Sequence, residues 1–425
     1  MGMRLVLTLA ILPIVVVAAL RRPFYGLLMI VIIYFARAPI WGAPEWLKPV
    51  VIMTGITLIS FFLSEEKKIG SPPIVSLNLL LIAFMFISSH YAVVDRSVAF
   101  EMTMDYCKLF IALYLTVHIV DSFDKLKTFY WVMIVGMLFL IRSAILQMIT
   151  IGPDRVNNIG GQGGGANYFA MLIVTTIPFL FFKIDSKNNI EKYVSYSLIP
   201  LWIFCLVLTG SRSGFLGLVV VSIYFFFIRG NKIKMSLIFL LIIVLSLSFV
   251  PGKYWERMDS IFNPTEESSA ASRLDLWDAA LQMYNDHSAT GVGPNNFELL
   301  SIKYTTWRTK DGKGFVVHST YLQMLAEVGL QGFLTLLVIM YMCHRMVRKR
   351  VAQIRKMNSP QSEQYAALGN STVAGLLGFY VCALTGSYIH IDVLFWMWGA
   401  AQAFVLLSDK LLLSNETVLE GKQIS

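Results

Sequence analysis

The sequence predicts an all-α protein that crosses a membrane many times, and two observations support this fold class. Of the 425 residues, 56% are hydrophobic and only 14% are charged, with a mean hydropathy of +0.65, which excludes a soluble globular class. Apolar runs of spanning length recur along the chain and indicate about twelve or thirteen transmembrane helices. The runs are too long and too uniformly apolar for the alternating strands of an outer-membrane barrel.

The expected spans fall into two blocks. The N-terminal block, residues 1–250, contains spans at about 4–20, 23–40, 47–63, 73–91, 99–120, 127–150, 166–183, 193–209, 213–228 and 233–250. The C-terminal block, residues 319–410, contains spans at about 320–343, 366–387 and 391–407. The first run resembles a signal peptide, but it continues into Leu20-Arg21-Arg22-Pro23 without a small-residue cleavage site, so we expect it to be retained.

A long segment of mixed polarity, residues 251–318, separates the two blocks. It contains two sets of larger apolar residues at helical spacing, which are Leu274, Trp277 and Leu281, followed by Phe297, Leu300 and Tyr304. A disordered linker would lack this periodicity, so we expect a folded helical lid. The polar residues 411–425 form a tail.

The distribution of lysine and arginine predicts the orientation. Basic residues collect in alternate connections, which are Arg21-Arg22, Lys67-Lys68, Lys125 to Lys127, Lys183 to Lys192, Arg229 to Lys234 and Arg345 to Lys356. By the positive-inside rule these connections and the tail are cytoplasmic, and the lid is external. The net charge of +9 is explained by this sidedness and by anionic headgroups, and a nucleic-acid partner is not expected.

The first candidate site residue is Arg212, in the external turn Thr209-Gly210-Ser211-Arg212-Ser213-Gly214. The flanking serines can cap a helix that begins at about Ser213. Exposed backbone N–H groups, the helix dipole and the guanidinium would then act together on an anion. The alternative is an arginine that extends to the lipid headgroups.

The second candidate is Arg273, in the lid. Ser272 and Asp275 have the spacing of a capping box, which would place Arg273 in the first turn of a helix. The positive end of a helix disfavours an arginine slightly, so its presence there suggests an anionic ligand. A solvated surface arginine is the alternative.

The third candidate is His318, just before the second block of spans. Thr320 and Gln323 also have capping-box spacing, so we expect His318 at the external end of a membrane helix. The helix dipole would keep the imidazole neutral, as a general base requires. A capping or interfacial histidine is the alternative.

Two arginines suit a diphosphate, because each guanidinium can bind phosphate oxygens bidentately and stays charged. A neutral histidine suits the removal of a proton from an attacking hydroxyl group. The sequence contains no Asp-x-Asp and no helical histidine pair, so we expect no metal and no cofactor.

The order of these motifs resembles the O-antigen ligase and polymerase superfamily of bacterial membrane glycosyltransferases. The resemblance covers about residues 160–390. It rests on Ser-Arg-Ser-Gly at Arg212, Ser-Arg-x-x-x-Trp at Arg273, Gly291-Val-Gly-Pro-Asn-Asn-Phe297, and His318-Ser-Thr-Tyr-Leu-Gln with Glu327-Val-Gly-Leu. Ser319 departs from the asparagine of many members. Leu20-Arg-Arg-Pro-Phe-Tyr-Gly also resembles the exosortase-associated O-glycosylation ligase branch.

The resemblance implies metal-independent, inverting transfer of a glycan from undecaprenyl diphosphate to an acceptor hydroxyl at the periplasmic face of the inner membrane. Arg212 and Arg273 would bind the diphosphate, and His318 would be the base. Further donor or acceptor contacts are expected at Asn167, Ser211, Asn295, Asn296, Tyr321 and Gln323.

Three questions about activity stay open. A lipid A-core sugar is the first acceptor expected, but a growing polysaccharide and a protein side chain require the same donor chemistry. A small-anion transporter is the more distant alternative, because the same arginines would also suit permeation. We expect an enzyme, since the lid is folded and broken helices in paired positions are missing from the pattern.

Overall fold

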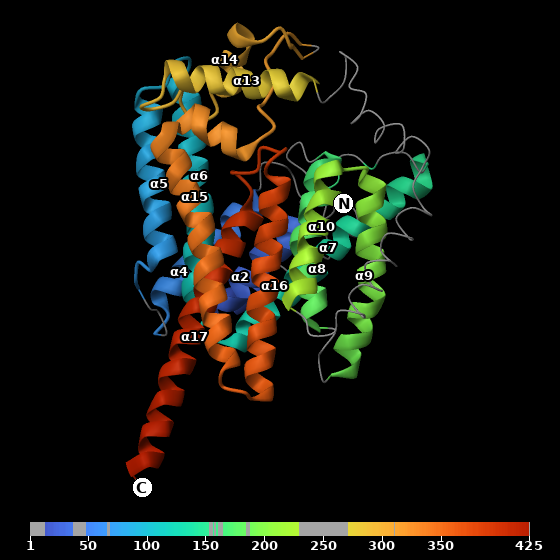
Figure 1. The fold of residues 1–425 in the computed structure, drawn as a ribbon, viewed down its shortest axis with the longest axis vertical. Helices are drawn as coiled ribbons and strands as arrows, with labels where there is room; N and C mark the ends of the chain where they lie inside the picture. Colours follow the sequence, from blue (N-terminus) through green and yellow to red (C-terminus); the bar gives the residue numbers. More distant parts are fainter. Residues whose placement is uncertain are drawn as a thin grey trace.

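The fold is described from a computed structural model, which places residues 13–36, 48–65, 69–152, 165–183, 188–228, 271–309 and 311–424, together with positions 156 and 159. These residues form helices and connections, without strands in the ranges given. Figure 1 shows an upright bundle with a helical lid across one end and the C-terminal helix extending from the other. The all-α fold class predicted from the sequence is confirmed.

The bundle helices follow the predicted spans closely. Their bounds are α2 (Pro23–Ala36), α4 (Pro49–Leu63), α5 (Pro73–His90), α6 (Arg96–Ile119), α7 (Phe123–Ile151), α8 (Ala166–Lys183), α9 (Asn189–Thr209), α10 (Arg212–Ile228), α15 (Thr320–Arg355), α16 (Pro360–Cys382) and α17 (Asp392–Ile424). Five of the described helices, α5, α7, α9, α15 and α16, are long and apolar enough to cross a membrane. The expected span 233–250 and most of 4–20 lie outside the described residues.

One predicted span, 320–343, differs from the structure. Helix α15 is interrupted at Gly329, where φ is 79° and ψ is −173°, so its first nine residues form a separate helical segment. A left-handed φ is natural for glycine and costly for other residues. The hydropathy of the predicted span gives no sign of this break.

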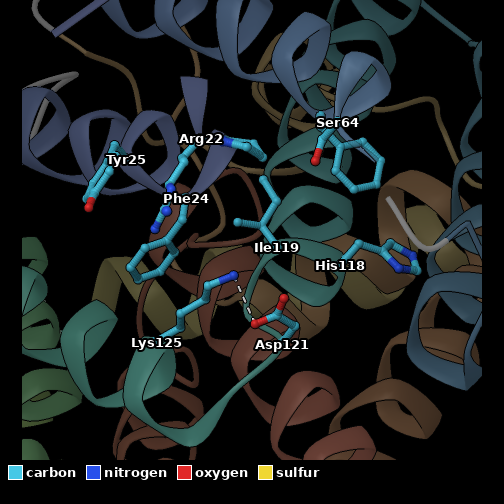
Figure 2. A pocket seen from close by; sticks show the side chains of 10 residues that line it. Arg22, Phe24, Tyr25, Ser64, His118, Ile119, Asp121 and Lys125 are labelled. Carbon is cyan, nitrogen blue, oxygen red and sulfur yellow. Dashed lines mark ion pairs between the residues drawn. The ribbon is translucent and has the colours of Figure 1, made fainter. Parts of the chain in front are cut away.

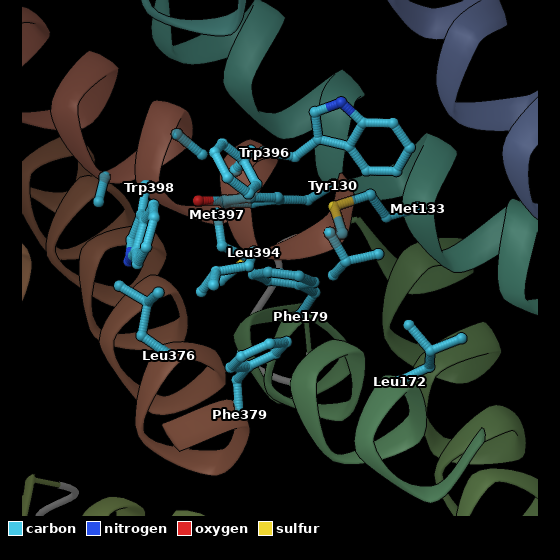
Figure 3. Packing of buried hydrophobic residues seen from close by; sticks show 14 of the residues in the cluster. Tyr130, Met133, Leu172, Phe179, Leu376, Phe379, Leu394, Trp396, Met397 and Trp398 are labelled. Atoms are coloured by element: carbon cyan, nitrogen blue, oxygen red, sulfur yellow. The ribbon is translucent and has the colours of Figure 1, made fainter. Parts of the chain in front are cut away.

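Helix α8 lies at the centre of the bundle, packed against α7, α9, α10 and α16. All of its side chains from Phe169 to Phe182 are buried, as expected for a helix that is apolar on every face. Figure 3 shows part of this packing, in which the Phe179 ring stacks on Tyr130 with centroids 3.9 Å apart. The Tyr130 hydroxyl is satisfied by Thr372 Oγ1 at 2.7 Å.

Small residues let α8, α10 and α16 approach one another closely. A Cβ added at Gly378 would lie 2.6 Å from Val174 Cγ1, and one at Gly217 would lie 3.2 Å from the Gly378 carbonyl oxygen. Membrane helices gain little from the hydrophobic effect when they associate, because lipid is already apolar. They therefore often rely on close backbone packing at small residues. These contacts fix α10, and therefore Arg212, relative to α16.

The described part of the lid contains α13 (Ala271–Asp286) and α14 (Phe297–Tyr304), which lie above α5, α6 and α15 in Figure 1. It has its own small core, which includes Leu276, Met283, Val292, Phe297 and Leu300. Of the two sets of apolar residues at helical spacing, the one in α14 contributes Phe297 and Leu300 to this core, whereas the one in α13 is largely outside it. There Leu274 and Leu281 are 63% and 44% exposed, whereas Ala279 and Ala280 are buried. Alanines on the inner face allow α13 to pack closely on α15.

A short extended segment joins the lid to the bundle. The Val292 N–H donates to the Ala326 carbonyl oxygen at 2.9 Å, and the Gly293 N–H donates to that of Glu327 at 2.9 Å. Gly291, with φ 70°, lies against this backbone, and a Cβ added to it would be 2.4 Å from the Glu327 carbonyl carbon. Backbone cannot move aside as a flexible side chain can, so this position requires glycine.

We therefore expect Gly291→Ala to destabilise the protein much more than Gly312→Ala. Gly312 also has a positive φ, of 74°, but a Cβ there would have no neighbour within 4 Å. Both variants carry the backbone strain of about 1–2 kcal/mol, but only Gly291→Ala adds a clash. The melting temperature in detergent should fall by roughly 5 °C more for Gly291→Ala. Equal melting temperatures would contradict the proposed packing.

The lid and two basic connections lie at opposite ends of the bundle. Asp95 caps the start of α6 and also bonds to Asn296 of the lid, whereas His118 is in the last turn of α6. Twenty-four helical residues span about 36 Å. The His118 end lies beside Arg22 and Lys125, which both belong to the basic connections. The charge asymmetry expected from the sequence therefore follows the long axis of the bundle.

Candidate functional site

Arg212 is the first residue of α10 and follows a tight turn that Gly210 makes with φ 56°. The Ser211 hydroxyl accepts the Gly214 N–H at 3.2 Å and lies 3.2 Å from the Ser213 hydroxyl. Ser211 therefore caps the helix, as the sequence predicted, although the helix begins one residue earlier than expected. The Arg212 side chain is half-buried at this helix end.

Arg273 is the third residue of α13 and is also half-buried. The predicted capping box is wrong here, because Ser272 already lies within the helix. Asp275 instead accepts the indole N–H of Trp307 at 2.7 Å and so joins α13 to the chain after α14. The expectation of an arginine in the first turn of a lid helix is nevertheless correct.

His318 lies immediately before the cap of α15 and has a left-handed backbone, with φ 54°. The predicted capping box is wrong here as well, because Ser319 is the N-cap and its hydroxyl accepts the Leu322 N–H. Burial and, secondarily, the nearby Arg273 cation lower the pKa of His318 to about 4. The ring is therefore neutral at pH 7, but for a different reason than the helix dipole expected from the sequence.

Electrostatic effects couple Arg273 to each of the other two candidates. Burial lowers the pKa of Arg273, the Tyr388 hydroxyl raises it, and the Arg212 cation lowers it further. Arg273 in turn lowers the pKa of His318. Residues from α10, from the lid and from the start of α15 thus share one electrostatic environment. Like charges held together away from water are costly, and a bound anion would offset that cost.

A connection that sequence reasoning missed completes this environment. The Thr320 hydroxyl donates to the Gly386 carbonyl oxygen at 2.7 Å and accepts the Tyr388 N–H at 2.8 Å. Tyr388 is buried, and its ring packs against Tyr168 with centroids 6.4 Å apart. The loop between α16 and α17 is therefore tied to the chain two residues after His318. The predicted span 366–387 included the first five residues of this loop, whereas α16 ends at Cys382.

The other residues predicted to contact the substrate lie in different surroundings. Asn167 and Ser211 stand at the starts of α8 and α10, and Tyr168, next to Asn167, contacts Tyr388. The Tyr321 hydroxyl instead donates to the Tyr380 carbonyl oxygen at 2.9 Å. The structure thus brings the neighbourhood of Asn167 to Tyr388 and directs Tyr321 toward α16.

Asn295 and Asn296 belong to the joint between lid and bundle. Asn296 is fully buried; its side chain accepts the Asp95 N–H at 2.7 Å and donates to the Asp95 carbonyl oxygen at 3.0 Å. Asn295 has a left-handed backbone with φ 59°. These contacts give Asn296 a structural role, anchoring the lid to the start of α6.

Glu327, which the sequence analysis named only as part of the family motif, is the centre of the same joint. One carboxylate oxygen accepts the Phe297 N–H at 3.3 Å, and the other accepts the Gln323 side-chain amide at 3.2 Å. Its backbone carbonyl accepts the Ser88 hydroxyl at 2.6 Å. Gln323, predicted to contact substrate, is thus buried and bonded within α15.

The apolar helices and the folded lid define a multi-pass membrane protein in which Arg273 of the lid is electrostatically coupled to Arg212 of α10. Residues 197–337, from α9 into α15, match the family model described as O-antigen ligase. The match contains Arg212, Arg273 and His318, and it confirms the resemblance to the O-antigen ligase and polymerase superfamily over this segment. Glycan transfer of the ligase or polymerase type is the function that it supports. Among curated proteins, no match to the chain was found.

Proposed function

We propose that this protein transfers a glycan from undecaprenyl diphosphate to an acceptor hydroxyl at the periplasmic face of the bacterial inner membrane. In this proposal residues 1–250 and 319–410 are the membrane blocks, and residues 251–318 are the periplasmic loop. A lipid A-core sugar is the first acceptor to test. The reaction is metal-independent and inverts the configuration at the anomeric carbon.

One observation carries the proposal: Arg273 of the lid is electrostatically coupled both to Arg212 and to His318, although the three residues are far apart in the sequence. Two guanidinium groups offer planar, permanently charged donors for the phosphate oxygens of the donor. Phosphates also suit the start of α10, because the helix dipole places partial positive charge there. All three residues fall within the segment matched to the ligase family.

The chemistry requires a single displacement. The acceptor oxygen attacks the anomeric carbon and forms the new glycosidic bond, while the bond from that carbon to the phosphate oxygen breaks. His318 takes the hydroxyl proton, and the undecaprenyl diphosphate leaves with the electron pair, its added charge stabilised by Arg212 and Arg273. One attack from the face opposite the leaving group inverts the anomeric carbon.

Diphosphate binding also prepares the base. In the free protein, the Arg273 cation disfavours a proton on His318. A bound diphosphate neutralises that cation and brings negative charge to the imidazole, so the pKa of His318 rises toward the range useful for a general base. The donor therefore activates the residue that consumes it.

The decisive experiment is transfer by the purified protein in liposomes. An undecaprenyl-diphosphate-linked glycan is supplied with lipid A-core, with a second lipid-linked repeat unit, or with a peptide containing serine and threonine. Transfer to lipid A-core supports a ligase, and transfer to the other acceptors supports a polymerase or a protein O-oligosaccharyltransferase. Flux of a small anion without any transfer would contradict the proposal and support the transporter alternative.

The pH dependence of the reaction should reveal the free and bound states of His318. Because His318 accepts a proton only when neutral, kcat/KM should rise with pH through the free-protein pKa of about 4 and level off by about pH 5. The kcat profile, which reports the donor complex, should rise at a higher pH. We expect initial rates from pH 3.5 to 8 to show this separation. Coincident profiles would contradict activation by the donor.

A further inference from the structure

A second polar pocket lies at the end of the bundle opposite the lid. Its volume is about 170 Å³, and it lies between the start of α2, the ends of α4 and α6, and the start of α7. Figure 2 shows the side chains around it, with Arg22, Phe24 and Tyr25 on one side and Ser64 and His118 on the other. It is about the length of α6 away from the lid, so it is separate from the candidate transfer site.

The charged groups of this pocket are partly ordered by contacts within the protein. The Lys125 ammonium lies 2.9 Å from the Asp121 carboxylate and 5.6 Å from the centre of the Phe24 ring. Arg22 reaches the pocket from the start of α2 and is exposed. With two cations and one carboxylate, the lining keeps an excess positive charge. The Asp121 carboxylate holds Lys125 in place, and the positive charge of Arg22 adds to that of the pair.

Its surroundings suit a lipid headgroup. Phe61 and Ile119 line the pocket together with these charges, and Tyr25, 46% exposed, stands at its margin. Polar and apolar groups therefore meet where a helix end reaches the membrane surface. A space of this size is several times the roughly 30 Å³ of one liquid water molecule, enough for a phosphate group. Basic pockets between membrane helices bind phosphate-bearing headgroups in this way.

We propose that Arg22 and Lys125 bind the phosphate of an anionic phospholipid in the leaflet opposite the lid. The guanidinium binds phosphate oxygens through its paired N–H groups, and the lysine contributes a fixed point charge. The α2 start, where Pro23 follows Arg22, adds the positive end of a helix to the same region. The bound lipid would join α2 to α7 at this membrane surface.

The experiment measures lipid binding to the full-length protein by native mass spectrometry, without any glycan donor. Phosphatidylglycerol should bind the wild type, and the paired substitution Arg22→Gln and Lys125→Gln should weaken that binding at least about tenfold, the loss of roughly 1.4 kcal/mol. The matched control is Arg21→Gln with Lys127→Gln, which removes the same charge from the same two connections. Neither residue lines the pocket, and Lys127 pairs with Asp124.

Several outcomes would overturn the proposal. Equal losses in both paired variants would show that only the general surface charge matters. Unchanged binding in the pocket variant would exclude the site, and equal occupancy by inorganic phosphate would exclude a lipid. Ser64→Trp provides a second variant that fills the pocket without changing its charge, and it should also abolish binding. Because no transfer is measured, failure here leaves the proposed transfer reaction standing.

Discussion

His318→Ala should lower the glycan transfer rate by at least about 100-fold, the usual contribution of a positioned general base. The variant keeps Arg212 and Arg273, so donor binding should persist while proton removal is lost. The measurement is single-turnover transfer from the lipid-linked donor, together with donor binding measured by its protection against thermal unfolding. Loss of transfer with retained donor binding is the signature expected of the base.

His287→Ala is the matched control for this variant. His287 directly follows the last residue of α13, fourteen residues after Arg273, so the two are about 21 Å apart along the helix. His287 is half-buried. Its replacement removes a lid histidine without touching the candidate site and should leave transfer within about twofold of wild type. Wild-type turnover in His318→Ala would contradict the assigned role.

Arg212→Lys and Arg273→Lys should each lower kcat/KM by roughly 10- to 100-fold, because a charged hydrogen bond contributes about 1.5–3 kcal/mol. Lysine keeps the charge but lacks the planar pair of N–H donors that binds two phosphate oxygens. The inhibition constant of undecaprenyl diphosphate, measured for each variant, should rise together with this loss. The corresponding glutamine variants lack the charge as well. Comparing them with the lysine variants separates the contribution of the guanidinium geometry from that of the charge.

A second measurement tests whether Arg273 lowers the pKa of His318. Since Arg273 lowers the pKa of His318, Arg273→Gln should raise that pKa and move the residual kcat/KM profile to higher pH. Arg96→Gln removes an exposed arginine from another helix start at the lid end and serves as the control. An unchanged pH profile in Arg273→Gln would show that the two side chains do not interact.

The membrane helices were predictable because lipid imposes one strong requirement on the sequence. Backbone groups in hydrocarbon must be paired within the helix, and the side chains around them must be apolar for about twenty residues. The bounds of α5, α8 and α10 accordingly match the predicted spans to within one residue. The buried face of lid helix α13 was harder to predict. It consists partly of Ala279 and Ala280, and alanine is only weakly hydrophobic.

The break in α15 could not be predicted from hydropathy. Gly329 is flanked by apolar residues, and its conformation is set by the carbonyl groups of Ser288 and Ala289, which would lie 3.0 and 3.1 Å from an added Cβ. The tie between Thr320 and the loop at Tyr388 is likewise a contact between distant segments. Such contacts leave no periodic pattern in the local sequence.

The candidate site was partly predictable because its chemistry requires unusual residues at helix ends. Two arginines and a histidine stood out in an apolar sequence, and the structure places them within electrostatic reach of one another. Their proposed roles remain predictions. Asn296 and Gln323 looked equally suited to a substrate, but they hold the lid in place; amide side chains serve both purposes, and only the fold distinguishes them.

The joint around Glu327 and the packing of α10 place the candidate site residues on two different groups of helices. Lid helix α13 and the start of α15 are connected through this joint to α5 and α6, whereas Arg212 belongs to α10, which packs on α8 and α16. The gap between the two guanidinium groups is therefore set by how these two helix groups fit together. A substitution at Gly378, where α16 packs against Val174 and Val221, is therefore expected to change the relative position of Arg212 and Arg273 without contacting either arginine.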